Sequence, residues 1–243
     1  MKTTGKHLEY EYSSSIPEQC WELEFQWKHT CLDLLSKHVS VHSRTTAKVL
    51  DVGCGRGDFL KLLSSSGYKC FGIDPDPECV RRSSKLANVS QGYVEDLMHM
   101  FQPDEFDMVT ALHVLEHTYN PVEAVSCISY VSKQFVLLAV PNLSTLQRLD
   151  FGSIRPCSND KHVCGWDHSH FANFLENICG LTIIDWGTDV VRLPRIGIGH
   201  ILRKLRLLKY VEYRLLPRLI PYCSNSVIAL CRVERPLIPH NST

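Results

Sequence analysis

An apolar run that ends in three alternating glycines constrains the fold of this 243-residue chain more than any other feature. The run covers residues 49–52, the glycines are Gly53, Gly55 and Gly57, and a helix-like pattern follows at once. Glycine is required where the backbone takes a positive φ or where a ligand approaches it closely. In open parallel sheets, such an approach occurs at the carboxyl ends of the strands. The segment therefore predicts a ligand site after the first strand of an α/β sheet.

Short β-branched segments alternate with helical ones through the residues that follow. The expected strands cover 48–52, 69–73, 89–94, 108–112 and 134–140, with helices at 59–65, 78–86 and 121–132 between them. Crossover helices of this length require right-handed connections and a parallel sheet covered on both faces. A helix at 169–179 and strands at 181–186 and 226–232 follow. The expected fold class is therefore α/β and Rossmann-like.

The segments that flank this pattern differ from it in composition. We expect residues 1–46 to form an N-terminal helical extension and residues 47–243 to form one α/β domain. Residues 142–168 are polar and rich in ring side chains, which predicts a lid loop. Residues 196–219 form a basic amphipathic insert, because 192–218 contain eight Lys or Arg residues and one Glu. Such a helix either caps the sheet with a solvated basic face or makes peripheral contact with an anionic membrane.

Composition narrows the cellular setting and the partners. The chain carries 26 basic and 26 acidic residues, so no global basic field indicates DNA as a partner. Its eleven cysteines include no C-x-x-C pair, and several lie in strand-like segments as small apolar residues. The first residues lack the apolar core of a signal peptide, and no apolar run reaches the roughly 18 residues that span a bilayer. We therefore expect a cytoplasmic protein, with peripheral membrane contact left open.

Glycine spacing separates two classes of nucleotide cofactor. Dinucleotide-binding turns follow G-x-G-x-x-G, which needs a third glycine where this chain has Asp58. The negative charges of Asp51 and Asp58 would not stabilise a bound pyrophosphate. They would stabilise the ammonium group of an amino-acid moiety. Asp74 ends the second strand about 20 residues later and can accept hydrogen bonds from both ribose hydroxyls of either cofactor. A nicotinamide oxidoreductase is disfavoured by the spacing, and cofactor competition tests it.

Five elements in order resemble the class I S-adenosylmethionine (SAM)-dependent methyltransferases over residues 48–233. They are the glycine turn, the strand end at Asp74, Val94-Glu95-Asp96-Leu97, the His113-Val114-Leu115-Glu116-His117 segment and Val140-Pro141-Asn142. The last two, together with residues 167–171, are most similar to the ubiquinone-pathway and natural-product O-methyltransferase branch. The resemblance implies a seven-stranded, mostly parallel sheet with an antiparallel last strand, a C-terminal cap insert, and SAM as cofactor.

The resemblance also implies a set of cofactor-binding residues. The methionine part of SAM would lie against Asp51, Gly53, Gly55 and Gly57, and the ribose against Asp74. The adenine would lie against Asp96 and Leu97, with Glu95 and Leu112 completing the set. Separate βαβ turns of an unrelated protein would not bring all five elements into this order.

Methyl transfer to oxygen requires a group that takes up a proton, and a histidine with a near-neutral pKa suits this role. The candidate catalytic residues are His113, His117 and His168, and His162 and His170 rank below them. His168 lies just before an expected helix, beside Trp166, in the predicted lid. Asp167 caps that helix or orients a neighbour.

The His113-x-x-Glu116-His117 segment also resembles a metal motif. Some relatives hold a divalent metal with Glu-x-x-Glu-His, and positions i, i+3 and i+4 share one helical face. A mixed nitrogen and oxygen set could bind zinc, manganese or iron. The same signature shapes the pocket floor in relatives without a metal. No metal is therefore assigned, and His113, Glu116 and His117 stay as candidate ligands only.

The expected function is SAM-dependent methyl transfer to an acceptor, with oxygen as the expected methylated atom, on a small-molecule, sugar or lipid-linked substrate. Two alternatives stay open. One is a metal-dependent RNA 2′-O-methyltransferase, which the neutral charge and the lack of an appended RNA-binding domain disfavour. The other is a non-catalytic SAM-fold subunit that binds or scaffolds, which intact glycines and Asp74 disfavour. The acceptor atom, the pathway and the oligomeric state do not follow from these residues.

Overall fold

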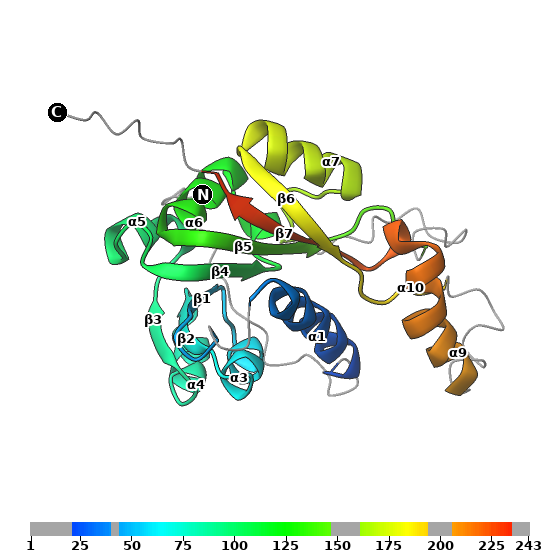
Figure 1. The fold of residues 1–243 in the computed structure, drawn as a ribbon, viewed down its shortest axis with the longest axis horizontal. Coiled ribbons are helices and arrows are strands. Elements are labelled where there is room, and N and C mark those ends of the chain that lie inside the picture. Colours follow the sequence, from blue (N-terminus) through cyan, green and yellow to red (C-terminus); the bar gives the residue numbers. More distant parts are fainter. Residues whose placement is uncertain (1–20, 40–43, 147–160, 194–205, 235–243) are drawn as a thin grey trace, which may run out of the picture.

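A seven-stranded sheet forms the centre of the computed structural model, which describes residues 21–39, 44–146, 161–193 and 206–234 (Figure 1). The strand order is β3-β2-β1-β4-β5-β7-β6. The strands are β1 (Lys48–Val52), β2 (Lys69–Asp74), β3 (Asn88–Gln91), β4 (Phe106–Leu112), β5 (Ser132–Pro141), β6 (Leu181–Gly187) and β7 (Ser226–Val233). Strands β1 to β5 are parallel, and β7 runs antiparallel between β5 and β6. The predicted Rossmann-like sheet with an antiparallel last strand is confirmed.

Helices cover both faces of this sheet, as predicted. They are α1 (Trp21–His38), α3 (Asp58–Ser65), α4 (Pro77–Ser83), α5 (Leu97–Met100), α6 (Pro121–Val131) and α7 (His168–Asn173), which continues as the π-helix η5 (Phe174–Ile178). Side chains alternate between the faces of a strand. Val49 accordingly packs with Leu34 of α1 and Leu63 of α3, whereas Leu50 belongs to the core cluster that contains Ile128 of α6 and Phe171 of α7.

The third strand is shorter than the predicted 89–94. It ends at Gln91, and the chain turns through Gly92 and Tyr93 into the 3₁₀ helix η2 (Val94–Asp96). The Asp96 carboxylate fixes this turn by accepting a hydrogen bond from the Tyr93 backbone N–H at 2.8 Å. The strand pattern alone could not reveal this cap, because Val94 is as apolar as a strand residue.

The chain after β5 returns to the sheet near Trp166. The Leu143 N–H donates to the Trp166 carbonyl at 2.8 Å, and the Val163 N–H donates to the Glu116 carbonyl at 2.7 Å. Residues 147–160 of the predicted lid lie outside the described residues.

The basic insert is described from residue 206 onward, whereas residues 196–205 lie outside the described parts. Its elements are α9 (Arg206–Tyr210), the π-helix η6 (Val211–Leu215), α10 (Leu216–Leu219) and the 3₁₀ helix η7 (Pro221–Cys223). Together they project beyond the edge of the sheet (Figure 1). The division at residue 46 stays a prediction, although α1 packs on the sheet of the α/β domain through Leu34 and Leu35.

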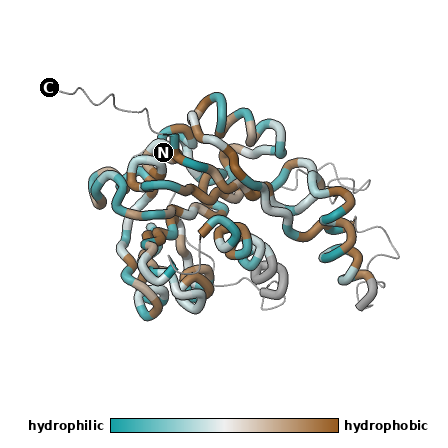
Figure 2. Tube along the Cα trace, in the orientation of Figure 1, coloured by the Kyte–Doolittle hydropathy of each residue, from teal (hydrophilic) through white to brown (hydrophobic). Residues whose placement is uncertain are grey.

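Hydrophobic residues gather in the central strands (Figure 2), where β4 is buried except at Asp107 and β5 is buried from Phe135 to Val140. The nine cysteines in the described ranges are all free thiols. No helix within those ranges is both long and apolar enough to cross a membrane.

Candidate functional site

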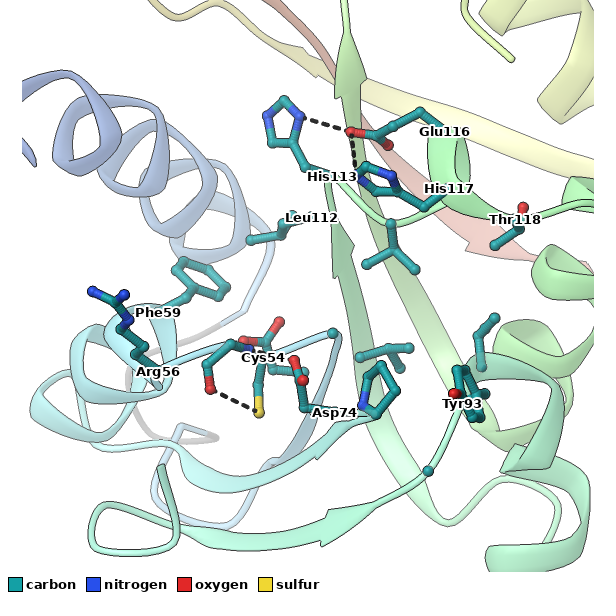
Figure 3. A pocket seen from close by; sticks show the side chains of 18 of the residues that line it. Cys54, Arg56, Phe59, Asp74, Tyr93, Leu112, His113, Glu116, His117 and Thr118 are labelled. Carbon is teal, nitrogen blue, oxygen red and sulfur yellow. Dashed lines mark hydrogen bonds and ion pairs between the residues drawn. The ribbon is translucent and has the colours of Figure 1, made fainter. Parts of the chain in front are cut away.

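A cavity of about 450 Å³ opens at the carboxyl ends of β1, β2 and β4, which is the edge that the glycine turn predicted. The turn between β1 and α3, the end of β2, the segments after β3 and β4, and α1 all contribute to its wall. Figure 3 shows Cys54 and Asp74 at one end of the cavity and His113, Glu116 and His117 at the other. Two segments far apart in the sequence therefore face one space.

The glycine turn needs its glycines for different reasons. Gly53, Gly55 and Gly57 all have a positive φ, of 68°, 54° and 85°. A Cβ on Gly53 would lie 2.6 Å from Val114 Cγ2, whereas a Cβ on Gly55 would meet no atom within 4 Å. Gly55 also lines the cavity. The open side of Gly55 is thus where a ligand can approach the backbone.

Asp74 links the end of β2 to this turn. Its Oδ2 accepts a hydrogen bond from the Gly55 N–H at 2.7 Å, and its Oδ1 accepts one from the Asp76 N–H at 3.0 Å. Burial raises the pKa of Asp74, and the two backbone N–H donors oppose that rise. The carboxylate borders the cavity and keeps further lone pairs for ribose hydroxyls.

Asp51 forms a buried acidic part of the wall. Thr110 Oγ1 donates to its Oδ1 at 2.6 Å. Burial raises the pKa of Asp51 to about 7, while the Thr110 hydroxyl and the positive charge of Lys28 lower it. A ligand with a positive charge would favour the ionised form of this carboxyl, as any close cation does.

The structure separates the other predicted cofactor residues into two groups. Glu95 and Leu112 line the cavity. Asp96 and Leu97 are not among its lining residues, because Asp96 caps η2 and Leu97 lies in the core. Gly57 is likewise outside the lining, and a Cβ there would lie 2.9 Å from Leu86 Cδ1.

Helix α1 supplies two cavity residues that the sequence did not indicate, Trp27 and Lys28. Lys28 is 8% exposed, and its Nζ lies 3.3 Å from Asp58 Oδ2. The Trp27 ring packs edge-on against the ring of His113, with 4.9 Å between centroids. A nearly buried cation therefore stands beside the acidic glycine turn.

The segment after β4 turns sharply at His113, which has a φ of 60°. Its Nδ1 lies 3.2 Å from Glu116 Oε1, and its Nε2 lies 3.3 Å from Ser226 Oγ of β7. A positive φ in a non-glycine residue costs free energy and is common at functional sites. Contacts from Trp27, Glu116 and Ser226 hold the ring in this position.

Glu116, His117 and His162 complete a group with His113, which we call the histidine cluster. Glu116 is 1% exposed, and its Oε2 is buried with no hydrogen-bond partner in the described structure. His117 Nδ1 lies 3.2 Å from the Lys161 carbonyl oxygen, and His117 Nε2 lies 4.0 Å from Glu116 Oε1. The ligand atoms of Glu116, His117 and His162 all lie within 4.8 Å of one another. The cluster can therefore exchange a proton or hold a cation.

His168 lies elsewhere. It begins α7, and it is not among the residues that line the cavity. Its ring packs 5.6 Å from that of Trp186 and 5.2 Å from that of Tyr222. Burial lowers the pKa of His168. Asp167 caps the helix as expected, with its Oδ1 accepting from the His170 N–H at 2.8 Å.

Residues 24–184 match the profile of a family described as "Methyltransferase domain", which is more than half of the chain. The chain belongs to this methyltransferase family. SAM is the cofactor of the family, as expected from the glycine turn and Asp74.

Curated relatives of this methyltransferase come from the branch that the His113–His117 segment indicated. A ubiquinone biosynthesis O-methyltransferase of Nitrosospira multiformis is 30% identical over 136 residues, which is 52% of this chain and 56% of that protein. One from Xanthomonas campestris is 37% identical over 110 residues, which is 42% of this chain and 44% of that protein. The match thus spans about half the length of these relatives.

Solved structures share the fold of this methyltransferase at low identity. Magnesium protoporphyrin IX methyltransferase from Synechocystis, with bound SAH, superposes with a TM-score of 0.61 at 13% identity and covers 90% of this chain and 89% of its own. The YcgJ protein from Bacillus subtilis has a TM-score of 0.55 at 19% identity and covers 86% of this chain and 100% of its own. At these identities the likeness concerns the fold alone.

Proposed function

We propose that this chain transfers a methyl group from SAM to a hydroxyl oxygen of a small or lipid-linked molecule. The observation that carries the proposal is a single cavity that joins the glycine turn and Asp74 to the histidine cluster. O-methyl transfer requires a site that orients the cofactor and a group that takes up the acceptor's proton. The residues that we assign to these two roles line one cavity in this chain.

The cofactor end of the cavity suits SAM in its charges and shape. SAM, when bound, supplies an electrophilic methyl group on a positively charged sulfur. Lys28 and Asp51 offer opposite charges for the carboxylate and ammonium groups of a methionine moiety. Asp74 offers its carboxylate to the ribose, and Gly55 leaves its backbone open. An acidic wall of this kind would repel a pyrophosphate.

His117 is the proton acceptor that the geometry favours. The Lys161 carbonyl can only accept a hydrogen bond, so a neutral His117 carries its hydrogen on Nδ1. Its Nε2 is then the basic nitrogen. The buried Glu116 carboxylate, 4.0 Å from that nitrogen, would stabilise the positive ring formed when a proton arrives.

His113 has a different part in this proposal. Its Nδ1 lies within hydrogen-bond distance of Glu116 Oε1, and its Nε2 lies within hydrogen-bond distance of Ser226 Oγ. Both ring nitrogens are thus engaged with protein groups. His113 therefore orients Glu116 and is a positioning residue.

A metal-assisted form of the same reaction is the second candidate. The donor atoms of Glu116, His117 and His162 lie close enough together to hold one divalent cation. Glu116 Oε2, buried without a partner in the described structure, fits such a ligand. A cation there would supply positive charge that lowers the pKa of an acceptor hydroxyl.

We infer the class of acceptor from the names of the relatives. Those matched over part of this chain are named ubiquinone biosynthesis O-methyltransferases. We extend to this chain only the chemistry of a phenolic or other hydroxyl acceptor of small size, with or without an apolar tail. The cavity of about 450 Å³ lies within the range of sites that bind small molecules.

Radiolabelled methyl transfer tests the proposal. Purified protein is incubated with methyl-labelled SAM and, separately, catechols, hydroquinones with and without a prenyl tail, and a short RNA, before and after treatment with EDTA. Label on the oxygen of a phenolic acceptor is the expected result. Label on RNA alone, or tight SAM binding without transfer to any acceptor, would overturn it in favour of the RNA enzyme or the scaffold. Activity lost with EDTA and restored by Mn²⁺ would select the metal-assisted form.

A further inference from the structure

The helical arm formed by residues 206–223 exposes apolar and basic side chains together. Tyr210, Leu215, Leu219 and Tyr222 are 61%, 44%, 66% and 69% exposed. Large apolar residues exposed singly are ordinary on a protein surface, but a group of them on one projecting element indicates an interaction site. The arm stands away from the sheet in Figure 1.

The charged side chains that the arm exposes to solvent are all positive. Lys209, Arg214 and Arg218 are exposed. The acidic residue of the arm, Glu212, is 6% exposed and turned inward, with its Oε1 accepting from the Leu193 N–H at 2.9 Å. No carboxylate in the described parts of the chain forms an ion pair with Arg214 or Arg218. The chain has zero formal net charge, so this positive surface is a local feature.

The arm is fixed to the edge of the sheet that carries the cavity. Asn142, directly after β5, donates from its Nδ2 to the Tyr222 carbonyl at 2.9 Å and the Ser224 carbonyl at 2.7 Å. The residue before it, Pro141, lines the cavity. The Val191 N–H donates to the Glu212 carbonyl at 3.1 Å. A surface that binds the arm would therefore lie at the same edge of the sheet as the cavity.

We propose that the arm docks on an anionic lipid bilayer through Tyr210, Leu215, Leu219 and Tyr222, with Lys209, Arg214 and Arg218 contacting the lipid head groups. Leucine and tyrosine enter the boundary between head groups and acyl chains, and basic residues on the same helix are attracted by negative lipids. The exposed positive charges favour an anionic bilayer over a second copy of the chain as the partner of the arm. A second copy of the chain in a symmetric contact would set the positive arm against itself, which costs free energy.

Vesicle sedimentation tests the proposal without SAM or acceptor, so its result is independent of methyl transfer. We expect the protein to sediment with vesicles of phosphatidylcholine and phosphatidylglycerol, to bind vesicles of phosphatidylcholine alone at least roughly tenfold less, and to be released at high salt. Equal binding to both kinds of vesicle, or binding that salt does not weaken, would overturn the proposal.

Surface variants locate the contact on the arm. We expect Arg214→Glu with Arg218→Glu, and separately Leu215→Ser with Leu219→Ser, to weaken vesicle binding at least roughly tenfold. A matched control pairs Lys85→Glu with Ile178→Ser, which lie at other exposed positions and should leave binding unchanged. Thermal unfolding and SAM titration check that each variant is folded. Wild-type binding by both arm variants would overturn the proposal. So would binding to RNA or formation of a dimer, in place of vesicle binding, that the arm variants abolish.

Discussion

The Nδ1 atom of His113 lies 3.2 Å from Glu116 Oε1, and the other carboxylate oxygen of Glu116 is buried without a partner in the described structure. A buried unpaired polar atom is rare in folded proteins and costs about 1–3 kcal/mol. In the function proposed above, an imidazolium or a cation in the adjoining cavity would satisfy this oxygen. Glu116 is thus the centre of the histidine cluster, although the sequence ranked it only as a candidate metal ligand.

Replacing His117 separates proton transfer from cofactor binding. We expect His117→Gln to lower kcat for methyl transfer by roughly 10²- to 10⁴-fold, because Gln cannot take up the acceptor's proton. The Kd for SAM should stay within about threefold of wild type, since His117 lies at the other end of the cavity from Asp74. His170→Gln, at an exposed position outside the cavity, is the control. An unchanged kcat in His117→Gln would contradict the assignment of the base.

Replacing Asp74 removes a ligand contact and a link inside the protein. We expect Asp74→Ala to weaken binding of both SAM and SAH at least roughly tenfold, because the Gly55 and Asp76 N–H groups lose their acceptor along with the ribose. Calorimetric titration measures the affinities. Asp76→Ala is the matched control: it removes the cap of α4 at a cost of about 1 kcal/mol and should leave the affinities near wild type.

Two alanine variants in the glycine turn should lose different properties, one mainly stability and the other mainly affinity for SAM. Gly57→Ala brings a Cβ within 3.0 Å of Leu86 and Ser83, and we expect it to destabilise the protein by about 2 kcal/mol or more. Gly55→Ala meets no protein atom within 4 Å, so we expect a loss of only about 1 kcal/mol together with a marked loss of SAM affinity. Chemical denaturation and ligand titration on both proteins measure the two effects. Equal effects on stability would show that the packing around Gly57 is loose.

Asp51 should make stability depend on pH. Burial raises the pKa of this carboxyl from 3.8 to about 7, so between these pH values the folded state holds a proton that the unfolded state has released. The free energy of unfolding therefore falls as pH rises from about 4 to about 7. Asp51→Asn lacks this titrating group. Between pH 5 and pH 8 its free energy of unfolding should therefore rise by at least about 1 kcal/mol relative to that of wild type. Denaturation curves across that range measure the difference, and parallel curves would contradict it.

The fold was predictable because its signals are local. The apolar run before Gly53 and the repeated strand and helix lengths determine a parallel sheet, and the glycine turn marks the edge where ligands bind. The residues at which the strands end were less predictable. The third strand ended early because the Asp96 carboxylate caps Tyr93, and a side chain that bonds to nearby backbone leaves no periodic pattern.

The sequence predicted the candidate site residues that lie at the ends of strands. It did not predict those that other elements contribute. Asp51, Asp74 and His117 each stand at or just after a strand end, so their order along the chain reveals their shared edge. His162 was ranked low, because its segment reaches the cluster through contacts between distant parts of the chain, which leave no pattern in the sequence. They include the hydrogen bond from the Val163 N–H to the Glu116 carbonyl and the contact of His117 Nδ1 with the Lys161 carbonyl. His168 was ranked high for its neighbours, yet those neighbours pack it into an aromatic corner.

Helix α1 forms part of the cavity wall through Trp27 and Lys28, although it precedes the first strand of the sheet. The glycine turn and the histidine cluster belong to segments that the fold itself fixes. Trp27 packs against the ring of His113, and Lys28 lies 3.3 Å from Asp58 at the start of α3, so this one helix contacts both ends of the cavity. A substitution in α1 therefore reaches the acidic glycine turn and the histidine cluster through a segment that the strand pattern does not reveal.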